Sequence, residues 1–107
     1  MTKIKITKKD SHIIFLECDG HTGYGVEGED IVCSAISSVV QTAVLGIVAV
    51  AGINVDLKRK EGFLSLKIPE NITDEQQHDA DVILNTMLCG VQDLYEGYSD
   101  FIELEVK

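Results

Sequence analysis

The stretch that decides the fold is DIVCSAISSVVQTAVLGIVAVA, residues 30–51. Its apolar residues recur every three or four positions, and small polar residues such as Ser34, Ser37 and Gln41 stand between them. This spacing is typical of an α-helix with one broad apolar side. The sequence therefore predicts a long, largely buried helix, and the segments on both sides of it must supply the surface that it covers.

Five short segments predict strands, because apolar and polar residues alternate in them or β-branched and aromatic residues are frequent. They are residues 3–7, 12–18, 53–57, 64–68 and 102–106. Polar residues 8–11 join the first two segments, and the basic turn at residues 58–62 joins the next two. We therefore expect two hairpins and a closing strand.

A second helix is expected between the second hairpin and the last strand. Pro69 ends the preceding strand, and Thr73, Asp74 and Glu75 form the acidic start that favours a helix N-terminus. An apolar stripe at helical spacing follows and ends near Gly97. The order of elements is thus ββαββαβ, which predicts an α+β fold with a mainly antiparallel sheet and both helices packed on one face.

The length of 107 residues fits a single domain, residues 1–107, with one core. The sheet face away from the helices is expected to show some apolar residues among its charges, which would suit pairing with a second copy of the chain. These residues are Ile13, Phe15, Phe63 and Phe101. We expect a homodimer.

The charge and the cysteines exclude several classes of function. A formal net charge of -9 disfavours direct binding of nucleic acid and would instead attract a basic peptide or protein. Three cysteines without a C-x-x-C spacing argue against both a disulfide framework and a zinc site, and fit the reducing cytoplasm. The longest apolar run, residues 43–53, is too short to span a membrane.

Two other patterns have ordinary explanations. Residues 23–28 match G-x-G-x-x-G between a strand and a helix, but the acidic residues at the helix start would repel a pyrophosphate, so we expect no cofactor. His78 lies near Asp79 and Asp81 at a polar helix start, where a solvated face is expected rather than a metal site. Cys18 and Cys89 fall on apolar faces and are expected in the core.

Cys33 and His21 are the residues that could carry chemistry. Cys33 falls near the expected start of the long helix, where the helix dipole and unpaired N–H groups favour a thiolate, and His21 lies at the other end of the glycine-rich loop as a candidate base. The backbone N–H groups of Cys33 and Ser34 are candidate oxyanion donors. Asp30 either caps the helix or orients His21, and Ser37 either supports the site or solvates the helix.

Three pieces of the sequence resemble the ribosomal-processing cysteine protease (Prp) family. They are Gly20-His21, the run GEDIVCSAIS at residues 28–37, and Gln41-Thr42, and the resemblance extends over essentially the whole chain. It implies a cytoplasmic endopeptidase that removes a short N-terminal extension from a basic large-subunit ribosomal protein, cutting after an aromatic residue. Family members are generally dimeric, and the mechanism expected for Cys33 and His21 needs no cofactor.

In this resemblance Cys33 matches the nucleophile and His21 the catalytic histidine, while Asp30 and Ser37 match other motif positions. Thr22 and Ser34 depart from the small apolar residues common in the family. The loop glycines would let a lid close over a peptide and exclude water, and they are Gly20, Gly23, Gly25 and Gly28. The alternative is a non-catalytic ribosome-assembly or partner-binding module whose acidic surface docks a basic protein.

Overall fold

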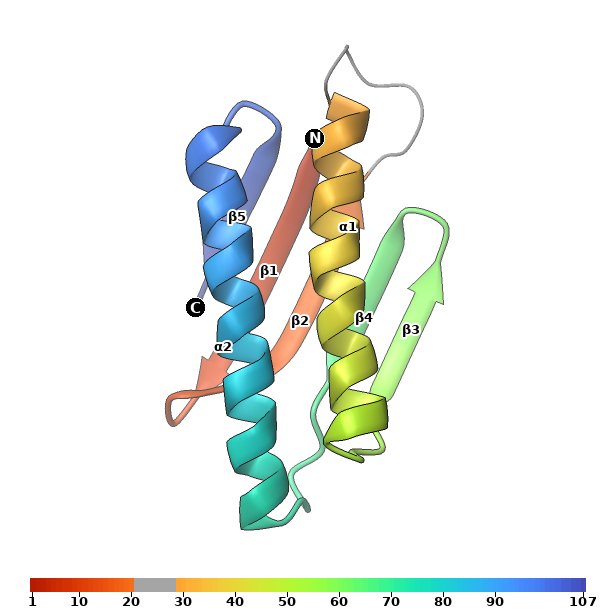
Figure 1. Cartoon of the computed structure of the whole chain (residues 1–107), viewed down its shortest axis with the longest axis vertical. Coiled ribbons are helices and arrows are strands. Elements are labelled where there is room, and N and C mark those ends of the chain that lie inside the picture. The colour runs from red at the N-terminus through yellow and green to blue at the C-terminus, as the bar shows by residue number, and fades with distance from the viewer. Residues whose placement is uncertain (21–28) are drawn as a thin grey trace.

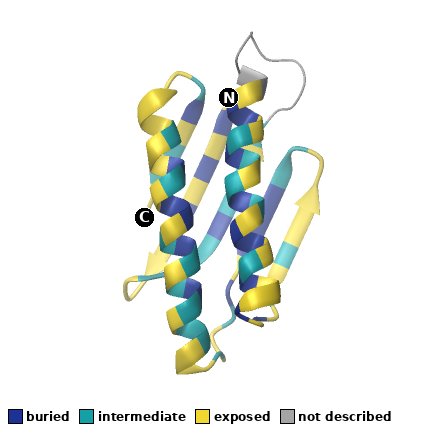
Figure 2. Cartoon of the chain, viewed as in Figure 1, coloured by how far each residue is buried: buried dark blue, intermediate teal, exposed yellow. Residues whose placement is uncertain are grey.

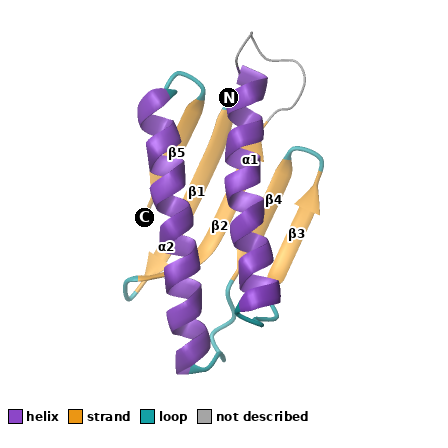
Figure 3. Cartoon of the chain, in the orientation of Figure 1, coloured by secondary structure: helices purple, strands orange, loops and turns teal. Residues whose placement is uncertain are grey.

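The computed structural model describes residues 1–20 and 29–107, and it describes the side chains from Ile31 onwards in the second of these ranges. Its elements follow the expected order ββαββαβ (Figures 1 and 3). They are β1 (Thr2–Lys9), β2 (His12–Gly20), α1 (Glu29–Leu45), the π-helical segment η1 (Gly46–Val50), β3 (Asp56–Lys60), β4 (Phe63–Lys67), α2 (Asp74–Gly97) and β5 (Ile102–Val106).

The strands form one five-stranded sheet in the order β3-β4-β2-β1-β5. The pairs β1/β2, β2/β4 and β3/β4 are antiparallel, whereas β5 lies parallel to β1 at one edge. The parallel pair arises because α2 carries the chain back along the sheet before β5 begins (Figure 3). The expected α+β fold with a mainly antiparallel sheet is therefore confirmed.

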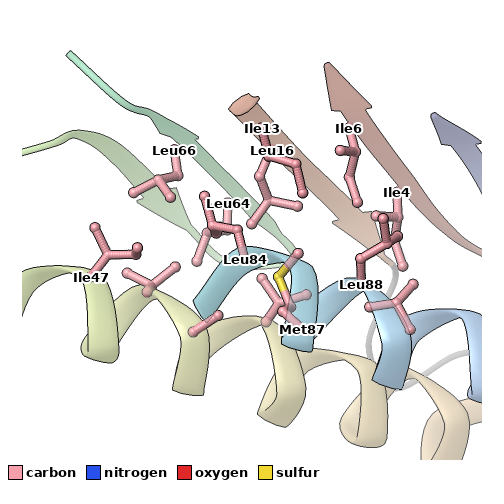
Figure 4. Packing of buried hydrophobic residues seen from close by; sticks show 14 of the residues in the cluster. Ile4, Ile6, Ile13, Leu16, Ile47, Leu64, Leu66, Leu84, Met87 and Leu88 are labelled. Carbon is pink, nitrogen blue, oxygen red and sulfur yellow. The ribbon is translucent and has the colours of Figure 1, made fainter. Parts of the chain in front are cut away.

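Both helices cover the same face of the sheet, and the core lies between the two layers (Figure 1). Side chains of β1, β2 and β4 point from the sheet towards those of α1 and α2, as Leu16, Leu64, Leu84 and Met87 show in Figure 4. The inner sides of both helices are buried and their outer sides are exposed or half-buried (Figure 2). This one-sided burial explains the helical periodicity of residues 30–51.

By length and apolar composition alone, Ile31–Val50 could cross a membrane. The core helix of a globular domain meets the same criteria, and here Val32, Ile36 and Val40 lie in the hydrophobic core. The outer side nevertheless exposes apolar residues, among them Leu45 and Val50. The segment is thus a core helix with an apolar outer side, and its apolar length exceeds the run of residues 43–53 expected from the sequence.

The second hairpin begins later than expected. Its first strand was predicted at residues 53–57 with a basic turn at residues 58–62, but β3 spans Asp56–Lys60 and the turn is reduced to Glu61 and Gly62. Ile53 is instead buried in the core just before the strand. The basic residues of the predicted turn therefore belong to an exposed edge strand.

The sheet face away from the helices is less apolar than expected. Ile13 is buried in the core and Phe101 packs against it, so both predictions for these residues are wrong. A register shift in the β1/β2 pairing brings both Ile13 and Leu16 to the helix side, which breaks the simple alternation along β2. Cys89 is exposed on α2 rather than in the core, whereas Cys18 packs partly buried against the core.

Oppositely charged residues face each other at the centre of this outer sheet face. Lys3 pairs in register with Asp19 on β2, and Lys5 pairs with Glu17 on β2 and with Glu105 on β5. Such cross-strand pairs stabilise a solvated sheet surface. The partly apolar surface expected on this face is therefore more polar than the sequence indicated, and the homodimer stays a prediction.

Candidate active site

Cys33 lies on α1 where that helix faces the beginning of β1. The side chain is buried, with 6% of its surface exposed, and its Sγ atom lies 2.8 Å from Oγ1 of Thr2. Thr2 is the first residue of β1 and is itself 1% exposed. A thiol on the helix layer is thus joined to a hydroxyl on the sheet layer by a buried hydrogen bond.

A pocket of about 110 Å³ opens beside this pair. It lies between the first half of α1, the ends of β1 and β2, and the β3–β4 hairpin. Its lining consists of Thr2, Cys18, Gly20, Cys33, Ser37, Val40, Gln41, Arg59, Lys60, Gly62, Phe63 and Leu64. The thiol therefore belongs to a concave surface that a peptide could enter.

Polar side chains of α1 and β3 form a row along the wall of the pocket. The Gln41 side-chain amide donates a hydrogen bond of 2.6 Å from Nε2 to Oγ of Ser37, one helical turn away. Arg59 donates a longer hydrogen bond of 3.4 Å from Nη1 to Oε1 of Gln41. Because Ser37 accepts from Gln41, its own O–H remains available as a donor.

The second thiol in the pocket is held in its protonated form. Burial, with a smaller contribution from the charge of Asp19 and from Cys33, raises the pKa of Cys18 to about 11. Among the described residues that line the pocket, the charged ones are cationic: Arg59 and Lys60, the latter with its Nζ 5.4 Å from the ring centroid of Phe63. The described part of the lining is thus basic, although the chain as a whole is acidic.

Three of the residues expected at the site line this one pocket: Cys33, Ser37 and Gly20. Of the remaining ones, Ser34 is exposed and is not part of the lining, whereas His21, Gly23, Gly25 and Gly28 lie outside the described residues, as does the side chain of Asp30. The roles of His21 and Asp30 and the lid therefore stay predictions.

The start of α1 differs from the expected one. The described helix begins at Glu29, with Asp30 as its second residue and Cys33 as its fifth. In an α-helix only the first four N–H groups lack a helical carbonyl partner. The expected oxyanion role of the Cys33 and Ser34 N–H groups stays a prediction, because the residues that precede Glu29 lie outside the described part of the chain.

Thr2 is the site residue that the sequence analysis missed, although a signal was present. It stands two residues before Ile4 and four before Ile6, and these residues are buried on the helix side of β1. Successive residues of a strand alternate between its faces, so Thr2 shares that buried face. A polar residue in phase with a buried apolar row indicates a hydrogen-bonding partner in the core.

The residues at the start of α2 have another role. Asp81 accepts hydrogen bonds from Nδ1 of His12 at 2.8 and 3.0 Å, and His78 Nδ1 lies 3.4 Å from Asp79. Asp81 thus joins the first hairpin to α2. Within residues 1–20 and 29–107, no cluster of three or more His, Cys, Asp or Glu side chains could hold a metal ion.

Comparison with known proteins connects the pocket with a class of enzyme. The model of a family described as cysteine protease Prp matches residues 1–103. The chain belongs to the cysteine protease Prp family. The family match covers nearly all of the chain, including β1 with Thr2, α1 with Cys33 and the hairpin that completes the pocket.

Individual relatives support the same assignment. The ribosomal processing cysteine protease Prp of Staphylococcus aureus is 30% identical over 110 residues, covering 100% of both chains. A crystal structure of an essential ribosomal processing protease Prp from S. aureus with a substrate peptide superposes with a TM-score of 0.87 at 28% identity. A second, with a covalently linked product peptide, gives 0.82 at 30% identity, and both alignments cover 100% of each chain.

The family assignment decides between the two classes of function that the sequence left open. The chain is a cysteine protease, so the non-catalytic binding module is set aside. Of the three cysteines, Cys33 lies in the pocket beside a hydroxyl partner, Cys18 has a raised pKa, and Cys89 is exposed on α2 away from the pocket lining.

Proposed function

We propose that the chain is a ribosomal-processing endopeptidase that removes an N-terminal extension from a large-subunit ribosomal protein, with Cys33 as nucleophile and His21 as general base. The observation that carries the proposal is the position of Cys33: a buried thiol at a pocket, in a chain that belongs to a cysteine protease family. Gly20, which directly precedes His21, lines the same pocket. The residue that precedes the proposed base in the sequence is therefore part of the pocket lining.

The proposed reaction is acyl transfer in two steps. His21 accepts the thiol proton and the Cys33 sulfur attacks the scissile carbonyl carbon, which forms a tetrahedral intermediate. The C–N bond then breaks, His21 returns the proton to the leaving amine, and a thioester remains on Cys33. A water molecule, deprotonated by His21, then attacks the thioester carbonyl carbon. The C–S bond breaks, the acid product leaves, and His21 returns the proton to the Cys33 sulfur.

The pocket offers suitable groups for a peptide. Phe63 is the aromatic residue of the described lining and is a candidate contact for the aromatic residue expected before the cleaved bond. Ser37 can donate its hydroxyl hydrogen to a peptide carbonyl, because its oxygen already accepts from Gln41. Hydrogen bonds of this kind orient an extended peptide without reading its sequence.

The proposal also covers the basic substrate protein, the cytoplasm and the homodimer. The net charge of -9 would draw a basic ribosomal protein towards the enzyme, although the pocket wall at Arg59 and Lys60 is basic. Three free cysteines are consistent with action in the cytoplasm, where ribosomal proteins are made. A homodimer belongs to the same proposal, and the apolar outer side of α1 is a further candidate interface.

The decisive experiment is cleavage of a peptide that spans the junction between the extension and the mature N-terminus of the large-subunit protein. We expect turnover by the purified chain and by Cys89→Ala, which removes an exposed thiol on α2. We expect none from Cys33→Ala, although calorimetry should still detect binding of the peptide. Continued cleavage by Cys33→Ala would exclude the proposed nucleophile.

The role of His21 needs a separate measurement, because loss of activity alone would not define it. We expect His21→Ala to lower turnover strongly while Cys33 remains the residue alkylated by a substrate-derived chloromethyl ketone. Mass spectrometry of the wild-type enzyme mixed with a slowly hydrolysed ester of the same peptide should detect an acyl adduct on the tryptic fragment containing Cys33. An adduct on Cys18 or Cys89 instead would contradict the mechanism.

A further inference from the structure

Thr2 is a buried polar residue with a specific partner. It and Ser65 are the two buried polar or charged residues of the described part of the chain. Its Oγ1 lies 2.8 Å from the Cys33 sulfur, and either atom can be the donor of this hydrogen bond. Burying a hydroxyl without a partner is unfavourable, so this contact is the one that makes threonine acceptable at the start of β1.

The surrounding main chain determines where the Thr2 hydroxyl lies. β1 is held between β2 and β5, with Thr2 opposite Gly20 on one side and Ile102 on the other, and its N–H donates to the carbonyl of Phe101 at 2.9 Å. A Cβ atom on Gly20 would lie 3.0 Å from Thr2 Oγ1. Because a β-branched side chain has few allowed rotamers, the hydroxyl is firmly oriented in this position.

The helix dipole gives Cys33 limited help. Its effect falls off within the first turn, and Cys33 is the fifth residue of α1. Among the described groups around the pocket, Arg59 and Lys60 are cationic, and Cys18 stays neutral at neutral pH. The Thr2 hydroxyl lies 2.8 Å from the Cys33 sulfur, so a hydrogen bond from this hydroxyl can stabilise the thiolate relative to the thiol.

We propose that Thr2 is a positioning residue for the nucleophile, whose hydroxyl fixes the Cys33 sulfur at the pocket and donates a hydrogen bond to it once the thiol proton has left. The inference rests on the proposed role of Cys33. In the resting thiol the S–H can donate to Oγ1, and in the thiolate the direction reverses, so that Oγ1–H donates to the sulfur. A hydrogen bond to a charged acceptor is stronger than a neutral one, which favours the thiolate.

The test compares Thr2→Val, which keeps the β-branched shape without the hydroxyl, with Thr2→Ser, which keeps the hydroxyl. Thr7→Val, on the same strand and outside the pocket, is the matched control. The rate of Cys33 alkylation by iodoacetamide is followed against pH by peptide mass spectrometry, which separates it from the other cysteines. We expect Thr2→Val to move the midpoint upwards by about one pH unit, equivalent to about tenfold slower alkylation at neutral pH.

Peptide cleavage supplies the second readout. We expect Thr2→Val to lower kcat about tenfold with little change in KM, and Thr2→Ser and Thr7→Val to keep the wild-type profile in both assays. A wild-type alkylation profile in folded Thr2→Val would overturn the inference. If Thr2→Val does not fold, judged by circular dichroism, Thr2→Ala decides by the same criteria, since it also lacks the hydroxyl.

The two proposals fail in different ways. If Cys33→Ala still cleaves the peptide, the nucleophile is wrong and the role of Thr2 is wrong with it. If Cys33→Ala is inactive but Thr2→Val behaves as the wild type, only the positioning role is refuted.

Discussion

The turn of the β3–β4 hairpin lies directly against the end of β2, through Gly62 and Gly20. The Gly20 N–H donates a hydrogen bond of 2.8 Å to the Gly62 carbonyl. A Cβ atom on Gly62 would lie only 2.7 Å from the Gly20 carbonyl oxygen, and Gly62 has a φ of +74°. Both glycines line the pocket that contains Cys33, so this close main-chain contact helps define one wall of the site.

Gly62→Ala should therefore affect both stability and activity. The substitution places a side chain in the left-handed region, at a cost of about 1–2 kcal/mol, and adds a clash with main-chain atoms that cannot rotate away. Gly52→Ala is a matched control, because Gly52 has a φ of +66° but no atom within 4 Å of the added Cβ. We expect thermal unfolding to show a larger loss for Gly62→Ala, and cleavage assays to show lower kcat/KM for that variant alone. Equal effects of the two substitutions would mean that the contact with Gly20 is unimportant.

The periodicity of the sequence predicts most of this fold because burial is one-sided in the elements concerned. The bounds of the edge strand β3 could not be predicted in this way, because β3 has no buried side. Its Lys58, Arg59 and Lys60 are all exposed, so no alternation of apolar and polar residues indicates a strand there. The residues of the pocket could be predicted from the sequence only in part. Cys33 and Ser37 could be predicted from a motif within one helix, whereas the contact of Cys33 with Thr2 joins residues 31 positions apart and depends on how α1 lies on the sheet.

A second prediction concerns the row of polar groups on the pocket wall. Gln41 Nε2 and Ser37 Oγ are 2.6 Å apart, so Gln41 orients the Ser37 hydroxyl for a peptide carbonyl. We expect Ser37→Ala and Gln41→Ala each to lower kcat/KM several-fold, and the double variant to be no worse than the poorer single one, with a coupling of about 0.5–1.5 kcal/mol. Thr42→Ala, which removes a hydrogen bond to the Ser38 carbonyl on the same helix, is the control. Strictly additive losses would show that Gln41 does not act through Ser37.

A third prediction uses the pH dependence of Cys18. Its pKa is raised from 9.0 to about 11, chiefly by burial, so the folded protein favours the neutral thiol. The Cys18 thiol of the unfolded chain ionises near pH 9, whereas burial keeps this thiol neutral in the folded protein up to about pH 11. The contribution of Cys18 to the free energy of unfolding therefore keeps its full value below pH 9 and falls as the pH rises from 9 towards about 11. In urea titrations at a series of alkaline pH values, Cys18→Ala should lose less stability than the wild type over this range. Cys89→Ala, at an exposed site, should follow the wild type, and an unchanged slope in Cys18→Ala would contradict the burial argument.

A fourth prediction separates the stability of the fold from the chemistry of the pocket. Thr73 caps α2: its Oγ1 accepts from the Gln76 N–H at 3.1 Å, and Gln76 Oε1 accepts from the Thr73 N–H at 3.0 Å. Thr73→Ala should lower the free energy of unfolding by about 1 kcal/mol, measured by urea denaturation. Gln76→Glu keeps an acceptor for the Thr73 N–H but loses the donor to the Gly52 carbonyl, so a smaller loss is expected.

The activity of these cap variants is the informative part of that experiment. The cap lies at the end of the molecule opposite the beginning of α1 and the pocket (Figure 1). Well below the unfolding temperature, both variants should therefore cleave peptide with wild-type kcat and KM, because local fraying of the first turn of α2 leaves the pocket wall unchanged. A fall in kcat for Thr73→Ala without global unfolding would instead show that fraying at the start of α2 alters the pocket. The packing of α1 against α2 along the core would then connect the two regions.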